Sequence, residues 1–81
     1  MKARYEDGVV SEAAKNARES IALEVKANRL QLNMTQQSLA DLSGTKKSNI
    51  SRMESGNYNP SLDFLVKVAE SMGKQISVHL D

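Results

Sequence analysis

Cysteine and tryptophan are missing from this 81-residue sequence, and histidine and proline each occur once. Without cysteine, neither a disulfide nor a thiolate metal site can stabilise so short a chain. A single histidine also argues against a zinc site, because such sites draw on several cysteine and histidine ligands. The sequence therefore predicts no cofactor and no metal, and stability must come from packed helices or from a second subunit.

Long apolar runs are absent as well. No stretch approaches the roughly 18 residues that would indicate a membrane span. The first seven residues include acids where a secretory signal would carry its apolar core. We therefore expect a cytoplasmic, nucleoid-associated bacterial protein with no membrane partner. Hydrophobic residues make up 40% and charged residues 26% of the sequence, which is ordinary for one small globular domain.

Charge of one sign is not in excess, because the formal net charge is +1. Composition alone thus does not indicate a nucleic-acid-binding protein, although a local basic patch is enough to neutralise phosphates. Such a patch lies mid-chain, at Lys46, Lys47 and Arg52. An enzyme is not predicted, because a nucleophilic triad needs its base on a rigid scaffold and the lone His79 lies in a terminal strand-like segment.

The first part of the chain predicts an arm and helical sequence. Residues 1–10 show no regular apolar period. From Ser11 to about Gln31 the chain is rich in good helix formers, and the Ser11 hydroxyl can cap the start. The pattern fits one long helix, or a short one followed by a second that begins near Glu19. We treat residues 1–18 as an N-terminal arm or helical extension.

A capped helix and a glycine follow. Thr35 is a suitable N-cap for a helix over Gln36–Leu42, and Gly44 can supply the left-handed conformation that ends it. The apolar period predicts that this helix buries Leu39, Ala40 and Leu42.

Two more helices are marked by similar signals. One runs from Lys46 or Lys47 to Glu54, with Ile50 and Met53 on its inner face. Ser61 caps the next, which Gly73 ends. Its predicted apolar face consists of Leu62, Leu65, Val66, Ala69 and Met72. The fold class is therefore all-α, with about five helices.

The last eight residues change to a period of two. Ile76, Val78 and Leu80 alternate with polar residues, which is a strand pattern. A lone strand after a helical domain has an unpaired edge. We expect it to pair with the same strand of a second copy across a two-fold axis. The predicted dimerisation residues are Gln75, Ile76, Val78 and Leu80.

The two helices flanking Gly44 predict DNA recognition. Such a pair lets one helix brace against the DNA backbone while the other enters the major groove. With Ile50 and Met53 inward, the second helix turns hydrogen-bond donors outward, as phosphate and guanine contacts require. These donors are Lys46, Lys47, Ser48, Ser51 and Arg52. Gln36 is placed to contact phosphate from the first turn of the bracing helix. The alternative is a helical bundle whose basic side chains are merely solvated.

Several spaced motifs resemble the Cro/C1-type (XRE) helix-turn-helix family. They fall within roughly residues 19–72 and comprise Thr35–Ala40, Gly44, Ile50–Glu54, Gly56 and Asn59–Leu62. The resemblance implies a lambda-repressor-like DNA-binding domain. It implies base or phosphate contacts at the positions matching Gln36, Lys46, Lys47, Ser48 and Arg52.

The same resemblance implies further roles. Asn49, Ser55–Asn57 and Tyr58 would lie along the phosphate backbone, with Tyr58 as a lid over the core being the alternative. Arg29 and Glu54 would form an inter-helical ion pair. One position departs from the family, because Lys46 stands where a capping Ser or Thr is usual. The cap of the recognition helix is then expected to fall to Thr45.

The flanks of the domain resemble HigA-type antitoxins. A helical extension precedes the domain and Gly73–Leu80 follows it. Proteins of that kind repress their own operon and bind an RNase toxin of the HigB/RelE class. The alternatives are a phage-type or metabolic regulator without a toxin partner, and a protein-interaction module on the same fold.

The sequence thus predicts three parts. Residues 1–18 form the arm or helical extension, 19–73 the helix-turn-helix domain and 74–81 the dimerisation strand. A homodimer of this kind would bind an inverted-repeat operator in double-stranded DNA, with its recognition helices about 34 Å apart.

Overall fold

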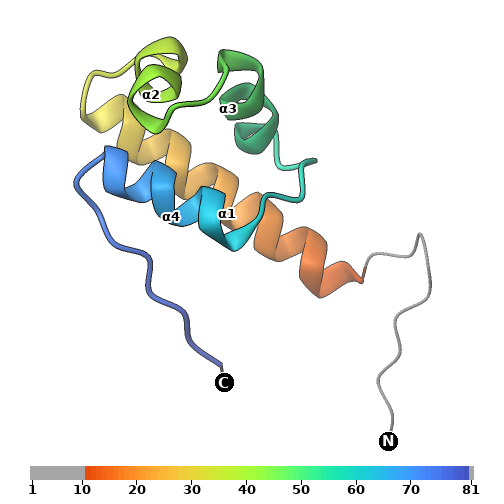
Figure 1. The fold of residues 1–81 in the computed structure, drawn as a ribbon. Helices are drawn as coiled ribbons and strands as arrows, with labels where there is room; N and C mark the ends of the chain where they lie inside the picture. Colours follow the sequence, from red (N-terminus) through yellow and green to blue (C-terminus); the bar gives the residue numbers. More distant parts are fainter. Residues whose placement is uncertain (1–10, 81) are drawn as a thin grey trace, which may run out of the picture.

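Over residues 11–80, the computed structural model has four α-helices joined by short loops and followed by an extended tail (Figure 1). Residues 11–80 are described, so predictions for the arm over residues 1–10 and for residue 81 lie outside it. The helices are α1 (Glu12–Gln31), α2 (Gln36–Ser43), α3 (Lys47–Glu54) and α4 (Leu62–Ser71).

A single helix of 20 residues, α1, occupies the segment for which one or two helices were considered. The Ser11 hydroxyl caps it by accepting from the Ala14 amide at 3.1 Å. No glycine or proline interrupts its Ala-, Glu- and Lys-rich sequence, so nothing local breaks it near Glu19. The prediction of five helices is therefore wrong for residues 11–80.

Local signals set α2 and the turn that follows. The Thr35 hydroxyl accepts from the Ser38 amide at 3.0 Å, and the Ser38 hydroxyl accepts from the Thr35 amide at 2.9 Å. These two bonds form the reciprocal cap of a capping box. Gly44 ends the helix with φ 68°, a left-handed conformation that favours glycine. The Thr45 amide then donates back to the Ala40 carbonyl at 2.9 Å, which closes the turn toward α3.

The core lies where α2 meets α3 and α4, with α1 packed along α3. Its buried residues are Leu39, Ala40, Ile50, Met53, Val68 and Met72. Leu42 and Leu62 were expected to face inward, but Leu42 is 64% exposed and Leu62 is 59% exposed. Val66 is exposed as well. The apolar surface of α4 is therefore wider than the surface the core covers.

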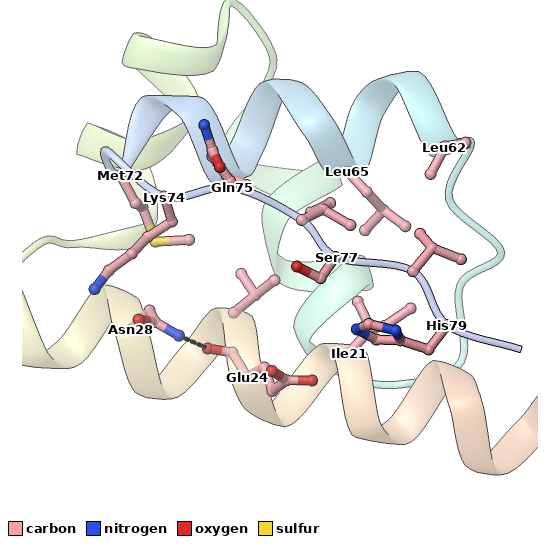
Figure 2. Close-up of a pocket in the computed structure, with 14 residues that line it drawn as sticks. Ile21, Glu24, Asn28, Leu62, Leu65, Met72, Lys74, Gln75, Ser77 and His79 are labelled. Atoms are coloured by element: carbon pink, nitrogen blue, oxygen red, sulfur yellow. Dashed lines mark hydrogen bonds between the residues drawn. The ribbon is translucent and has the colours of Figure 1, made fainter. Parts of the chain in front are cut away.

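The tail after α4 is extended but forms no strand within residues 11–80, so the predicted C-terminal strand is also wrong. An alternating pattern favours extended backbone, but a strand also requires a neighbour for its amide and carbonyl groups. Residues 11–80 offer none here. Instead the tail leaves Gly73, with the Lys74 amide bonded to the Ala69 carbonyl at 2.9 Å, and runs beside α1 and α4 (Figure 2).

Candidate DNA-binding surface

The predicted donors of α3 lie on one open face. Ile50 is 0% and Met53 2% exposed on the opposite side of the same helix. No side-chain hydrogen bond within residues 11–80 involves Lys46, Lys47, Ser48 or Ser51. The exposed members of this face are Lys46, Lys47, Ser48, Ser51 and Arg52. The face is thus free to donate to an outside acceptor.

The start of α3 differs from those of the other helices. Lys46 is its N-cap residue and makes no side-chain capping bond. The Thr45 hydroxyl does not take over this role, because it accepts instead from the Asn49 amide group, Nδ2, at 2.8 Å. The predicted shift of the cap to Thr45 is therefore wrong. Asn49 is half-buried and is turned toward this turn rather than fully outward.

Two neighbours within the protein restrain Arg52. Its Nη2 donates to Asn49 Oδ1 at 3.3 Å. Its guanidinium carbon lies over the ring of Tyr58, 5.7 Å from the ring centroid, which is within cation–π range. Tyr58 is half-buried and packs against the hydrophobic core. Neither role expected for Tyr58 from the sequence included this contact. No sequence pattern pairs a helix residue with a loop residue six positions later.

The loop after α3 is pressed against α1. Gly56 has φ 79°, and a Cβ placed there would lie 3.3 Å from Glu19 Cγ and 3.9 Å from Ala22 Cβ. Ser55 donates through its hydroxyl to the Arg52 carbonyl at 2.6 Å and accepts from the Asn57 amide at 3.3 Å. The exposed Asn57 side chain is therefore carried by a loop with a defined backbone.

A buried ion pair joins the helices behind this surface. Arg29 Nε and Nη2 donate to the two carboxylate oxygens of Glu54 at 2.7 and 2.9 Å, as the family resemblance implies. Arg29 Nη1 also donates to the Met34 carbonyl at 2.8 Å. Gln36 Nε2 donates to Glu54 at 3.1 Å, so the half-buried side chain of Gln36 is partly engaged within the protein. These bonds fix the start of α2 and the end of α3 to α1.

The hydrogen bonds with Glu54 raise the pKa of Arg29 above its ordinary value, against the lowering effect of burial. A group with a raised pKa contributes its stability below the unfolded pKa and loses it only as pH rises through the folded one. Arg29 therefore keeps its charge over the whole range in which proteins are usually studied.

A second surface lies on the other side of α1 and α4. A groove of about 580 Å³ runs between these two helices and the tail (Figure 2). Its apolar walls include Ile21 and Val25 of α1 and Leu62 and Leu65 of α4, and no residue of α2 or α3 lines it. Three of the predicted dimerisation residues, namely Gln75, Ile76 and Val78, also line this groove. Leu80 lies beyond it and is 96% exposed.

Within residues 11–80, no helix combines the length and the apolar character needed to cross a membrane.

A family model described as helix-turn-helix matches residues 25–78. An uncharacterized HTH-type transcriptional regulator of Haemophilus influenzae is 38% identical over 63 residues, which are 78% of this chain and 64% of that protein. The chain thus spans less than two thirds of this relative.

Two further likenesses agree with this match. An uncharacterized HTH-type transcriptional regulator of Archaeoglobus fulgidus is 38% identical over 52 residues, covering 64% of this chain and 73% of that protein. Among solved structures, a toxin–antitoxin module from Streptococcus pneumoniae gives a TM-score of 0.68 at 30% identity, covering 91% of this chain and 85% of that one.

Proposed function

Because this chain belongs to the XRE-type helix-turn-helix family, we propose that it regulates transcription by binding double-stranded DNA, with α3 in the major groove. The observation that carries this proposal is the open donor face of α3. A helix that is merely solvated could carry any polar residue at these five exposed positions. Here they are two lysines, two serines and an arginine. Such a face suits phosphate oxygens and the acceptors of guanine.

The contacts divide into two kinds. Ser48, Ser51 and Arg52 would reach base edges, because they follow the helix into the groove, and Lys47 would join them at its start. Phosphate contacts would come from the two ends of the unit. They would be made by Gln36, Lys46, Asn49 and Asn57. Phosphate contacts position the protein and make affinity salt-dependent, whereas base contacts specify sequence.

A homodimer on an inverted-repeat operator is the finer form of this proposal. Support comes from apolar side chains left open on the groove side, where Val78 is 70% and Leu62 59% exposed. The dimer would bury these side chains together with Gln75, Ile76 and Leu80, without a paired strand. No residue of α2 or α3 lines the groove, so two copies could associate there and leave both recognition helices free to bind DNA. Such a dimer could act as a repressor.

An RNase toxin of the HigB/RelE class is the protein partner that we propose. The solved structure from Streptococcus pneumoniae, described as a toxin–antitoxin module, supports it. The test is to express the product of the neighbouring gene with and without this chain. Growth arrest by the neighbour alone, relieved by this chain, is expected. A regulator without a toxin partner would show neither effect.

DNA binding is tested by selecting duplexes from a random library with the full chain. Affinity for the enriched sequence is then measured by fluorescence anisotropy over a series of salt concentrations. Arg52→Ala should weaken binding by about 1–3 kcal/mol and relax preference at one base pair. Lys15→Ala, which removes an equal charge from the exposed first turn of α1, is the matched control. Failure to enrich any sequence, or equal losses in the two variants, would contradict the proposal.

A further inference from the structure

Arg52 is a long, exposed side chain whose guanidinium must point in one direction to recognise a base. A free arginine samples many rotamers and loses that freedom on binding. Here two neighbours restrain it. Asn49, one turn earlier on α3, accepts one N–H at 3.3 Å, and the Tyr58 ring lies 5.7 Å from the guanidinium carbon. The guanidinium is thus held before any DNA arrives.

Tyr58 can serve as a support because its own position is fixed. Its side chain packs against the buried cluster that contains Ile50 and Met53. The loop that carries it is pressed against α1 at Gly56, where an added Cβ would meet Glu19 Cγ at 3.3 Å. Pro60 restricts the backbone of Asn59, the residue that directly follows Tyr58. Packing against the core therefore holds the Tyr58 ring beside Arg52.

The remaining donors of Arg52 suit one base. A guanidinium has five N–H groups in a planar fork, and Asn49 takes only one of them. No other side-chain hydrogen bond engages the Arg52 guanidinium within residues 11–80, so its remaining N–H groups are available to an outside acceptor. Two parallel N–H groups of a guanidinium match the O6 and N7 acceptors of guanine in the major groove.

We propose that Tyr58 is a positioning residue that holds Arg52 for readout of a guanine, and so sets base preference without touching the base. This inference rests on the proposed DNA-binding function. It differs from a phosphate contact by Tyr58, which would need the hydroxyl, because the positioning role needs the ring. It also differs from a purely structural role, which would weaken binding to every sequence alike.

The experiment compares affinities for the selected duplex and for its single-base-pair variants. The proteins are the full chain, Arg52→Ala, Tyr58→Phe, Tyr58→Leu and the double variant Arg52→Ala/Tyr58→Leu. Leucine keeps an apolar side chain for the core, and thermal unfolding checks that each variant is folded. Arg52→Ala should reduce the preference for guanine at one position by about 5- to 150-fold.

Tyr58→Leu should reduce the preference at that same position by about two- to fivefold, the range expected for an exposed cation–π contact. Tyr58→Phe should keep the preference, and the double variant should match Arg52→Ala alone, because Tyr58 then has nothing to position. Equal effects of Tyr58→Phe and Tyr58→Leu, or a uniform loss over all positions, would overturn the inference and leave DNA binding intact. A wild-type chain that selects no sequence would overturn the proposed function itself, and the inference with it.

Discussion

Arg29 near the end of α1 and Glu54 at the end of α3 form a two-point ion pair, with N–O distances of 2.7 and 2.9 Å. Their side chains are only 8% and 3% exposed. Each charge is therefore out of water and depends on the other, since the interior cannot solvate a lone ion. Through Met34 and Gln36 the pair also reaches the loop before α2 and its first turn. One cluster thus sets the relative placement of three helices.

Removing one member of this pair should be costly. Glu54→Ala leaves a buried guanidinium without its carboxylate, so the free energy of unfolding in urea should fall by about 3–5 kcal/mol. The double variant Arg29→Met/Glu54→Leu removes both charges and should lose less than Glu54→Ala. A Glu54→Ala protein that retains nearly all its stability would show that the pair contributes little.

The uncapped start of α3 predicts a trade between stability and DNA affinity. Lys46 has the extended backbone of an N-cap, φ −95° and ψ 149°, but no capping bond. Lys46→Ser should cap the helix and raise the free energy of unfolding by about 1 kcal/mol. It should also remove one phosphate contact, so that the salt dependence of DNA binding falls by about one unit of slope.

Two measurements separate these effects. Urea unfolding of Lys46→Ser and of Lys46→Ala shows whether the serine hydroxyl, rather than loss of the lysine, stabilises the helix. Titration with the selected duplex at several salt concentrations shows the lost contact. An unchanged slope would place Lys46 outside the DNA interface.

Glycine is required at position 56 for two reasons, whereas at position 73 only one applies. Both residues have a left-handed backbone, with φ 79° and 70°, but only at Gly56 would a Cβ meet a neighbour, at 3.3 Å from Glu19 Cγ. Gly73→Ala should therefore destabilise by about 1–2 kcal/mol through backbone strain alone. Gly56→Ala should destabilise by more.

The excess is traceable to one side chain. Glu19→Ala removes Cγ and leaves the Glu19 Cα at 3.6 Å and the Ala22 Cβ at 3.9 Å from the added Cβ, which are ordinary contact distances. The double variant Glu19→Ala/Gly56→Ala should then approach the stability loss of Gly73→Ala in thermal unfolding. Equal losses for the Gly56→Ala and Gly73→Ala single variants would contradict the close approach to α1.

Dimerisation at the groove predicts a different result for two equally exposed side chains. Val78 of the tail is 70% exposed and Leu23 of α1 is 69% exposed, and only Val78 lines the groove. Val78→Glu should place a charge in the interface and shift sedimentation toward the monomer. Leu23→Glu should leave the dimer intact. A dimer unaffected by Val78→Glu would move the interface away from the tail.

The sequence predicted those parts of the fold that local chemistry determines. Thr35 and Ser61 cap their helices because their hydroxyls meet amides three positions on, and Gly44 ends α2 because the turn is left-handed. The tail was predicted wrongly because its alternation specifies extended backbone, whereas pairing depends on a partner outside the pattern. Leu42 was misplaced because the core closes over one side of a short helix only.

The site shows the same division. The donors of α3 followed from the period of a helix with Ile50 and Met53 inward, and the structure leaves them exposed. The contact between Arg52 and Tyr58 could not be predicted, because it depends on how a loop folds back over its helix. The approach of Gly56 to Glu19 joins residues far apart in the chain, and no local pattern marks it.

The continuity of α1 has a mechanical consequence. The single helix α1 carries Ile21 and Val25 in the groove wall and Arg29 in the ion-pair cluster that holds α3. An inserted residue between Val25 and Arg29 would rotate the two surfaces against each other by roughly 100°. Each surface would keep its own residues, yet the two recognition helices of a dimer would no longer face the same side of a duplex. In the proposed dimer, the register of α1 would therefore set where the recognition helices lie relative to the interface between the two copies.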